Sequence, residues 1–168
     1  MRFSPPAEAD DVTFATGAGN EAHSARAKPR RFARSVLRLQ NRQRRAHGLR
    51  PLRPSRKLRR AAKRHARDMV RRHYFGHVSF AGRTVLDRVG RAGYGRRFSA
   101  GENLYYVVSR RPSPSQVVAA WMASPPHRHQ LLNPAWREVG IGTMMRPPFG
   151  GRSGVTAVGV YGARGARR

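Results

Sequence analysis

Three short segments, far apart in the chain, carry the residues best suited to chemistry: HYFGH at 73–77, AGEN at 100–103 and SPPHR at 124–128. They contribute His77, Glu102 and His127, each close to glycine or proline. Gly76 permits a sharp turn before His77, and two prolines give His127 a rigid lead-in. If the two imidazoles and the carboxylate converge on one cleft, they could bind a metal ion or transfer protons.

Neutral imidazoles are common zinc ligands, so His77 and His127 are the candidate metal ligands. Two alternatives stay open for the cofactor: zinc or another divalent cation, or none. Glu102 could join the ligand set, or it could hold one imidazole in a single tautomer from outside it. Ser124 and Asn103 lie beside these residues and are placed in the same predicted cleft. No residue is assigned as catalytic.

Each candidate also has a structural interpretation. A histidine near a helix end is usually hydrogen-bonded within the fold, and Glu102 could cap an element or pair with one of many arginines. Ser79 and Ser124 lie close in sequence to His77 and His127, but the chain has no G-x-S-x-G motif. A serine hydrolase is therefore the weaker interpretation.

Four helices follow from hydrophobic periodicity and capping signals. The first presents Phe32, Val36, Leu37 and Leu39 and ends near Gly48. The second starts after Ser55, ends near Gly76 and has an apolar face made of Leu58, Ala61, Ala62, His65 and Met69. The third follows a capping box of Thr84 and Asp87 and buries Val85, Leu86 and Val89. The fourth opens at Ser113–Pro114 and carries Val117, Val118, Trp121 and Met122.

Three strands are predicted in the second half of the chain. Residues 139–145 and 155–161 are apolar or alternating and bounded by glycines, with a hairpin loop at 147–154 between them. A further strand is predicted at 104–108.

The charge of the chain favours anionic partners. Its 168 residues contain 35 Lys and Arg against 8 Asp and Glu, a net charge of +27. Such a balance favours anionic wall polymer, an anionic lipid surface or nucleic acid, although an arginine-rich genome would also produce it. No nucleic-acid-binding module is recognisable, so only weak, salt-sensitive binding to nucleic acid is expected. The absence of cysteine excludes disulfides and thiolate zinc sites.

The domain is predicted to span residues 31–163, between a disordered tail at 1–30 and a short basic tail at 164–168. No apolar run approaches the length of a membrane span. The first residues do not form a clean signal peptide, so export would require an upstream start or an atypical route.

Five motifs, in order, resemble the CAP superfamily of cysteine-rich secretory, antigen 5 and pathogenesis-related 1 proteins, in its bacterial SCP-like branch. They are LRLQNRQRRAHGLRPL, LRRAAKRHARDM, HYFGHVSFAGRTVLDRVGRAGY, AGENL and VVAAWMASPPHRHQLLNPAWREVGIG. The resemblance covers roughly residues 33–162. It implies an α+β fold: a three-layer α-β-α sandwich with a small antiparallel sheet and a central cleft.

The cleft of this family usually presents two histidines and two glutamates. His77, Glu102 and His127 match three of them, and Ser124 stands where the second glutamate would fall. The resemblance implies an extracellular or envelope protein that acts as a binding or interaction module, with a metal ion as an option. The alternatives are a metal-assisted hydrolase using the same cleft and a non-specific nucleic-acid binder, the latter favouring the cytoplasm. Whether the protein is an enzyme stays open, and a non-enzymatic role is preferred.

Overall fold

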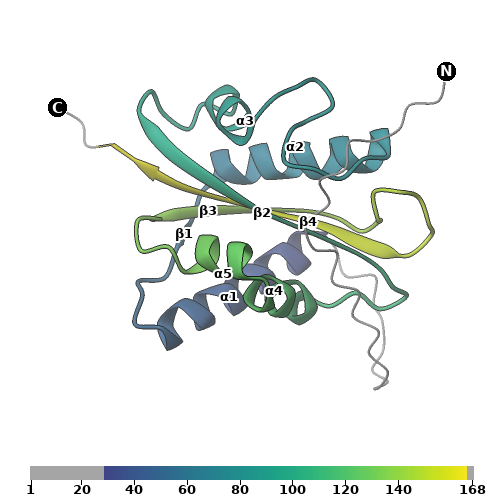
Figure 1. Cartoon of the computed structure of the whole chain (residues 1–168), viewed down its shortest axis with the longest axis horizontal. Helices are drawn as coiled ribbons and strands as arrows, with labels where there is room; N and C mark the ends of the chain where they lie inside the picture. Colours follow the sequence, from purple (N-terminus) through teal and green to yellow (C-terminus); the bar gives the residue numbers. More distant parts are fainter. Residues whose placement is uncertain (1–28, 166–168) are drawn as a thin grey trace.

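The computed structural model describes residues 29–165 and places a four-stranded sheet between two layers of helices (Figure 1). The strand order is β1-β3-β4-β2. β1 (Arg53–Pro54) runs parallel to β3 (Glu138–Met144), whereas β4 (Gly154–Arg164) is antiparallel to both β3 and β2 (Phe98–Val108). The predicted three-layer α+β fold is confirmed. The sheet is mixed rather than wholly antiparallel, because the two-residue strand β1 runs parallel to β3. This short strand was not predicted from the sequence.

The predicted tails lie mostly outside the described residues. Of the predicted N-terminal tail, residues 1–30, the structure describes Pro29 and Arg30, which begin the first helix. Of the predicted C-terminal tail, residues 164–168, Arg164 ends β4 and Gly165 follows it.

Helices cover both faces of the sheet (Figure 1). α2 (Arg56–Arg72) and α3 (Val85–Arg91) lie on one face. α1 (Pro29–Ala46), α4 (Pro114–Ala123) and α5 (Pro125–Leu132) lie on the other. None of the described helices is long and apolar enough to cross a bilayer.

The buried face of α1 differs from the prediction in its second half. Phe32 and Val36 are buried as expected, but the stripe continues through Gln40 and Arg44 rather than through Leu39. The Arg44 guanidinium donates to three backbone carbonyls, those of Arg50, Leu131 and Asn133, and these hydrogen bonds replace its hydration. A buried cation is tolerated when its donors are used in this way.

α2 packs closely on the sheet, with the apolar face that its sequence predicts. Ser55 caps its first turn, and the helix ends at Arg72, short of the predicted Gly76. A Cβ atom on Gly140 of β3 would lie 1.9 Å from the backbone nitrogen of Arg59. Glycine is therefore what allows the backbones of α2 and β3 to touch.

β2 is longer than the predicted segment 104–108. It pairs with β4 over its whole length, from Phe98 opposite Arg164 to Val108 opposite Gly154. The AGEN segment thus lies within an edge strand. α5 was not predicted from the sequence, although Pro125 at its start is a favoured first-turn residue.

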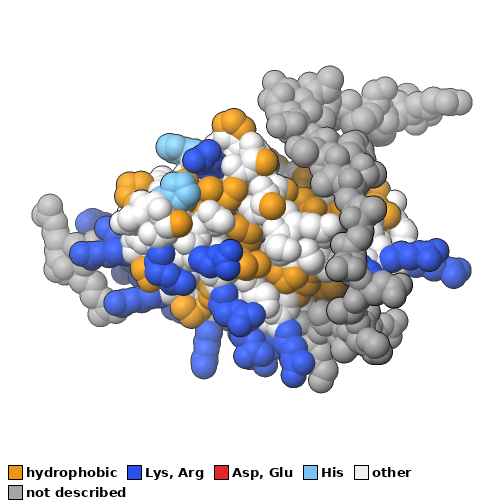
Figure 2. Space-filling model, turned by 90° about the horizontal axis from the view of Figure 1, so that it is seen from below, with side chains coloured by type: hydrophobic (Ala, Val, Ile, Leu, Met, Phe, Trp, Pro, Cys, Tyr) orange, Lys and Arg blue, Asp and Glu red, His pale blue; other side chains and the backbone are white. Residues whose placement is uncertain are grey.

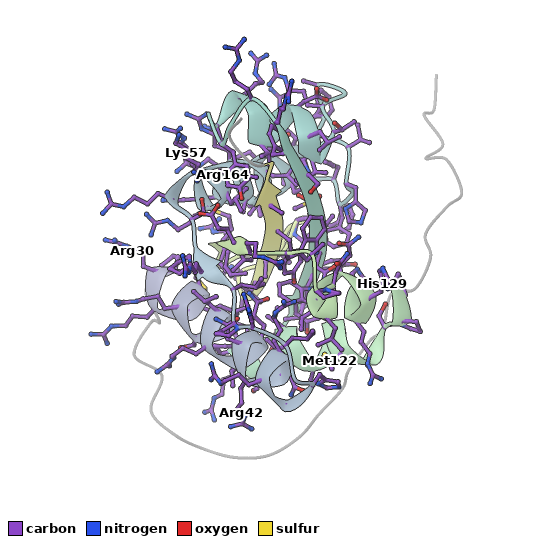
Figure 3. The ribbon with its side chains drawn as sticks, turned by 90° about the vertical axis from the view of Figure 1, so that its left-hand side faces the viewer. Arg30, Arg42, Lys57, Met122, His129 and Arg164 are labelled. Carbon is purple, nitrogen blue, oxygen red and sulfur yellow. The ribbon has the colours of Figure 1, made fainter. Side chains whose placement is uncertain are left out.

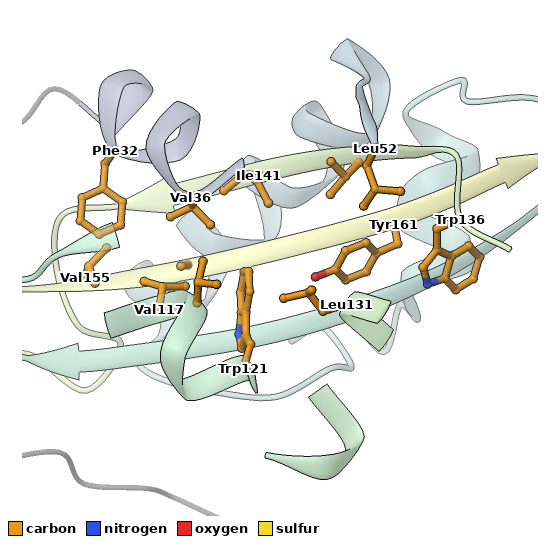
Figure 4. Packing of buried hydrophobic residues seen from close by; sticks show 13 residues of the cluster. Phe32, Val36, Leu52, Val117, Trp121, Leu131, Trp136, Ile141, Val155 and Tyr161 are labelled. Atoms are coloured by element: carbon orange, nitrogen blue, oxygen red, sulfur yellow. The ribbon is translucent and has the colours of Figure 1, made fainter. Parts of the chain in front are cut away.

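The core on the α1, α4 and α5 side joins the sheet to these helices (Figure 4). Trp121 of α4 is 1% exposed, and its indole nitrogen donates to the carbonyl of Leu104 on β2. This bond satisfies the polar end of a large buried ring and fixes α4 against the strand that carries the candidate site.

Candidate functional site

Glu102 lies on the edge strand β2 with a side chain that is only 1% exposed. Its Oε1 atom is 3.0 Å from Nδ1 of His77, and its Oε2 atom accepts a 2.7 Å hydrogen bond from Nη2 of Arg88. The carboxylate therefore joins an exposed imidazole to a buried guanidinium. Such partners are needed because an unpaired buried charge is strongly disfavoured.

Arg88 belongs to this site but was not predicted from the sequence. Its Nη1 atom donates to the backbone carbonyls of His77 and Arg83, each at 2.7 Å. One guanidinium thus holds both Glu102 and the backbone of the loop between α2 and α3.

The inward position of Arg88 could have been inferred from helical spacing. It lies three residues after Val85 and one before Val89, two residues that pack against the core on the α2 side. The prediction that Leu86 is buried in α3 was wrong, since Leu86 is 51% exposed. Arg88 faces inward because Glu102 compensates its charge.

His77 projects from the loop after α2, and its side chain is 59% exposed. A carboxylate oxygen can only accept, so a neutral His77 carries its proton on Nδ1, toward Glu102. Its Nε2 atom is then an unprotonated lone-pair donor with no partner among the described residues. The site therefore offers an oriented imidazole to solvent.

His65 lies behind the Glu102–His77 pair and is almost fully buried. Its Nε2 atom is 2.9 Å from the carbonyl oxygen of Gly76 and 3.9 Å from Oε1 of Glu102. Burial lowers the pKa of His65, because the charged form loses its hydration. A neutral His65 that donates Nε2–H to Gly76 fixes the turn that leads into His77.

His127 forms the second half of the site, on α5. Its Nδ1 atom lies 2.8 Å from Oγ of Ser124, the residue that stands in place of a glutamate. Asn103 donates to the backbone carbonyl of His127 at 2.8 Å and to the buried hydroxyl of Tyr161 at 3.3 Å. Each candidate imidazole therefore has its Nδ1 atom held by a polar side chain.

The two halves flank the same strand. Glu102 and Asn103 are neighbours on β2, and side chains of neighbouring strand residues point to opposite faces of a sheet. His77 accordingly comes from the α2–α3 layer and His127 from the α5 layer. Of the predicted residues, His77 and Glu102 are in direct contact, and Asn103, the neighbour of Glu102 on β2, donates to the backbone carbonyl of His127.

The donor set limits which metal site is compatible with the described residues. Among them, no group of three or more His, Cys, Asp or Glu side chains is arranged to hold an ion. Each oxygen of Glu102 has a protein partner, His77 on one side and Arg88 on the other, so the carboxylate orients the His77 imidazole. A site with three protein ligands, typical of catalytic zinc, does not fit this arrangement. The imidazoles of His77 and His127 are the groups that an ion could use.

The same geometry bears on hydrolysis. Glu102 is buried and ion-paired with Arg88, so it is badly placed to take a proton from a substrate. Ser124 contacts His127, but it is only 7% exposed and lies between α4 and α5. A nucleophile or general base must be accessible to its substrate, and both of these side chains are buried.

Comparison with known sequences identifies relatives. Residues 37–161 match the CAP family, described as the cysteine-rich secretory protein family. The uncharacterized protein YkwD of Bacillus subtilis is 32% identical over 123 residues, which are 73% of this chain and 46% of YkwD. The chain therefore spans less than half the length of this curated relative.

Solved structures share the fold. An outer surface protein from Borrelia burgdorferi superimposes with a TM-score of 0.66 at 22% identity, over 79% of this chain and 92% of that one. An extracellular SCP-domain protein from Bacillus anthracis superimposes with a TM-score of 0.64 at 23% identity, over 82% of this chain and 44% of the other. At these identities the likeness establishes the fold alone.

Proposed function

Because the chain belongs to the CAP, or cysteine-rich secretory protein, family, we propose that it is a binding module of the bacterial cell envelope. In this proposal His77 and His127 are its recognition groups, on either side of the edge strand β2. Glu102, Arg88, Ser124 and Asn103 hold them in place.

One observation carries the proposal: the exposed imidazole of His77 is held from behind by a buried, ion-paired carboxylate. A buried ion pair often stabilises a fold less than apolar residues of the same volume would. Its presence at the base of an exposed histidine therefore favours a role in positioning that histidine for a ligand.

The proposal includes a divalent cation such as zinc. The Nε2 atom of His77 is the ligand on which this part rests, because carboxylate-supported imidazoles are typical metal ligands. His127 is the second predicted ligand. An ion bound there would add a local positive charge that attracts anionic groups.

The envelope location is also part of the proposal. It is supported by the descriptions of two structural relatives, one an outer surface protein and the other an extracellular protein. Fractionation of the native cells, with detection of the chain by antibody, tests it. Recovery in the cytosol alone would contradict the location.

Isothermal calorimetry with zinc tests the site. The parent protein is compared with His77→Ala, with the double variant His77→Ala/His127→Ala, and with the matched control His47→Ala/His129→Ala. The control removes two exposed histidines outside the proposed ligand set. We expect zinc affinity to fall at least about tenfold in both site variants, as loss of one ligand implies, and to persist in the control.

Circular dichroism and thermal unfolding establish that each variant is folded. Two results would contradict the proposed zinc site: equal zinc affinity in the parent and the double site variant, or no zinc binding by the folded parent.

A further inference from the structure

A basic groove of about 850 Å³ lies between α1 and α2, along the edge of β3. Seven arginines and one lysine line it, and none of the described residues that line it is acidic. One wall, on α1, includes Arg30 and Arg34, and the other, on α2, includes Arg59, Arg60, Lys63 and Arg67. Arg30 of α1 and Lys57 of α2 project on the same side of the molecule in Figure 3.

The charge of the basic groove is not neutralised within the described part of the chain. Its eight cationic side chains are exposed, and none of them forms an ion pair there. Asp68 and Glu138, the acids closest in sequence to its lining, are paired with Arg72 and Arg164. Basic side chains also gather on the face seen in Figure 2, where no acidic side chain is visible. A concave surface of one sign focuses the field on an anion that enters it.

The floor of the basic groove is the outer edge of β3. β1 pairs only with Glu138 and Val139, and no described strand covers β3 beyond them on that side. The carbonyl of Val139 accepts from the amide of Ser55. Backbone groups alternate along a strand, so those of Ile141 and Thr143 point toward the same edge.

We propose that the basic groove binds a single, extended chain of phosphodiesters, a polyol phosphate polymer of the cell envelope. This inference rests on the envelope location in the proposed function but not on the histidine site. Guanidinium groups bind phosphate oxygens in pairs of parallel hydrogen bonds. Two facing cationic walls allow one flexible chain to be contacted from both sides along α1 and α2.

The lining favours this polymer over the other anionic partners. Proteins that bind single-stranded nucleic acid stack its bases on aromatic rings, and none of the described residues in the basic groove is aromatic. A bilayer presents a broad surface, whereas these cations line a recess. A flexible polymer without bases satisfies both constraints.

The basic groove and the histidine site are separate. In the order β1-β3-β4-β2, the groove follows β3, whereas Glu102 lies on β2 at the opposite edge. In Figure 3, His129 of α5, the helix that also carries His127, lies on the side of the molecule opposite to Arg30 of α1. Substitutions can therefore affect one site without the other.

Fluorescence anisotropy with a labelled glycerol phosphate oligomer, measured over a series of salt concentrations, tests the proposal. The groove variant is Arg34→Gln/Arg59→Gln/Lys63→Gln, which removes charge from both walls. The matched control is Arg91→Gln/Arg96→Gln/Arg110→Gln, three exposed arginines outside the groove that form no side-chain hydrogen bond among the described residues. Both variants lose the same charge.

We expect the groove variant to bind the oligomer at least about tenfold more weakly at low salt. The slope of log affinity against log salt should fall by about 2, or roughly 0.7 for each lost phosphate contact. The control and His77→Ala/His127→Ala should retain the parent affinity and slope. In the parent, the amide resonance of Ile141 should shift when the oligomer is added.

Three results would overturn the proposal. Equal losses in the groove variant and the control would mean that total charge, rather than the groove, determines binding. Loss of binding in the histidine variant would place the polymer at the other site. Binding of a base-containing DNA oligonucleotide of equal charge at least about tenfold more tightly would identify nucleic acid as the partner.

Discussion

Replacing Glu102 by glutamine probes the electrostatic centre of the histidine site. The substitution keeps the shape of the side chain and removes its charge. Arg88, whose side chain is 8% exposed, is then left without a counter-ion, and the hydrogen bond from His77 loses its charged acceptor. The backbone contacts of Arg88 with His77 and Arg83 are unaffected by the change.

The expected loss of stability follows from the burial of the pair. Removing one partner of a buried ion pair costs about 3–5 kcal/mol, and an amide that still accepts one hydrogen bond reduces this to about 2–4 kcal/mol. Arg88→Met should cost at least as much, because it also removes the donor to two carbonyls. The double variant should be more stable than the sum of the two single changes predicts, by about 2 kcal/mol.

Urea unfolding followed by far-ultraviolet circular dichroism measures these differences. With a slope of about 2 kcal/mol/M, the middle of the usual range in urea, Glu102→Gln should lower the unfolding midpoint by about 1–2 M. Glu138→Gln is the matched control, because its ion pair with Arg164 is partly exposed and should contribute no more than about 1 kcal/mol. If Glu102→Gln costs no more than Glu138→Gln, or if the Glu102 and Arg88 changes are additive, the reasoning is wrong.

Three further predictions concern the fold and the histidines. Gly140→Ala should lower the free energy of unfolding in urea by about 3 kcal/mol, because the added Cβ would overlap the α2 backbone. The control Gly90→Ala in α3 should be neutral or stabilising. Equal effects of the two changes would contradict close packing of α2 on β3. Because the pKa of His65 is lowered in the folded state, the unfolded chain binds a proton at this residue first as the pH falls. The free energy of unfolding should therefore keep its full value above pH 6.5 and decrease below it. His65→Gln should reduce this decrease in the free energy of unfolding, measured by urea unfolding at several pH values. An unchanged pH dependence would contradict the assignment of the decrease to His65. Long-range 1H–15N spectra should show neutral His77 protonated on Nδ1, and Glu102→Ala should remove this preference; an Nε2–H tautomer in the parent would refute the hydrogen bond to Glu102.

Much of the architecture could be predicted from local sequence signals. Ser55 caps α2, Thr84 and Asp87 form the predicted capping box of α3, and Ser113 caps α4. These signals act over three or four residues, so they can be recognised in the sequence without knowledge of the fold. The apolar face of α2 was equally predictable because its period matches the helix.

The features that were missed depend on contacts between distant segments. Arg44 and Arg88 are buried because carbonyls or a carboxylate from other elements satisfy them, and the chain offers 35 Lys and Arg side chains among which to choose. The short strand β1 exists only because β3 lies beside it. Period and composition carry no information about such long-range partners.

The histidine site was predictable in composition but not in arrangement. The sequence motifs brought His77, Glu102 and His127 together as candidates. What they could not supply is the burial of Glu102 and its bond to Arg88, which hold the carboxylate behind the His77 imidazole. The basic groove was foreseen only as an excess of charge, because its walls come from two helices that meet across β3.

The most direct test of the proposed role of His77 is a zinc titration of the parent protein, followed by long-range 1H–15N spectra of the histidine rings. We predict that Nε2 of His77 is perturbed at the lowest zinc concentrations while its Nδ1–H bond to Glu102 persists. Perturbation of His47 or His129 with an unchanged His77 ring would contradict the account.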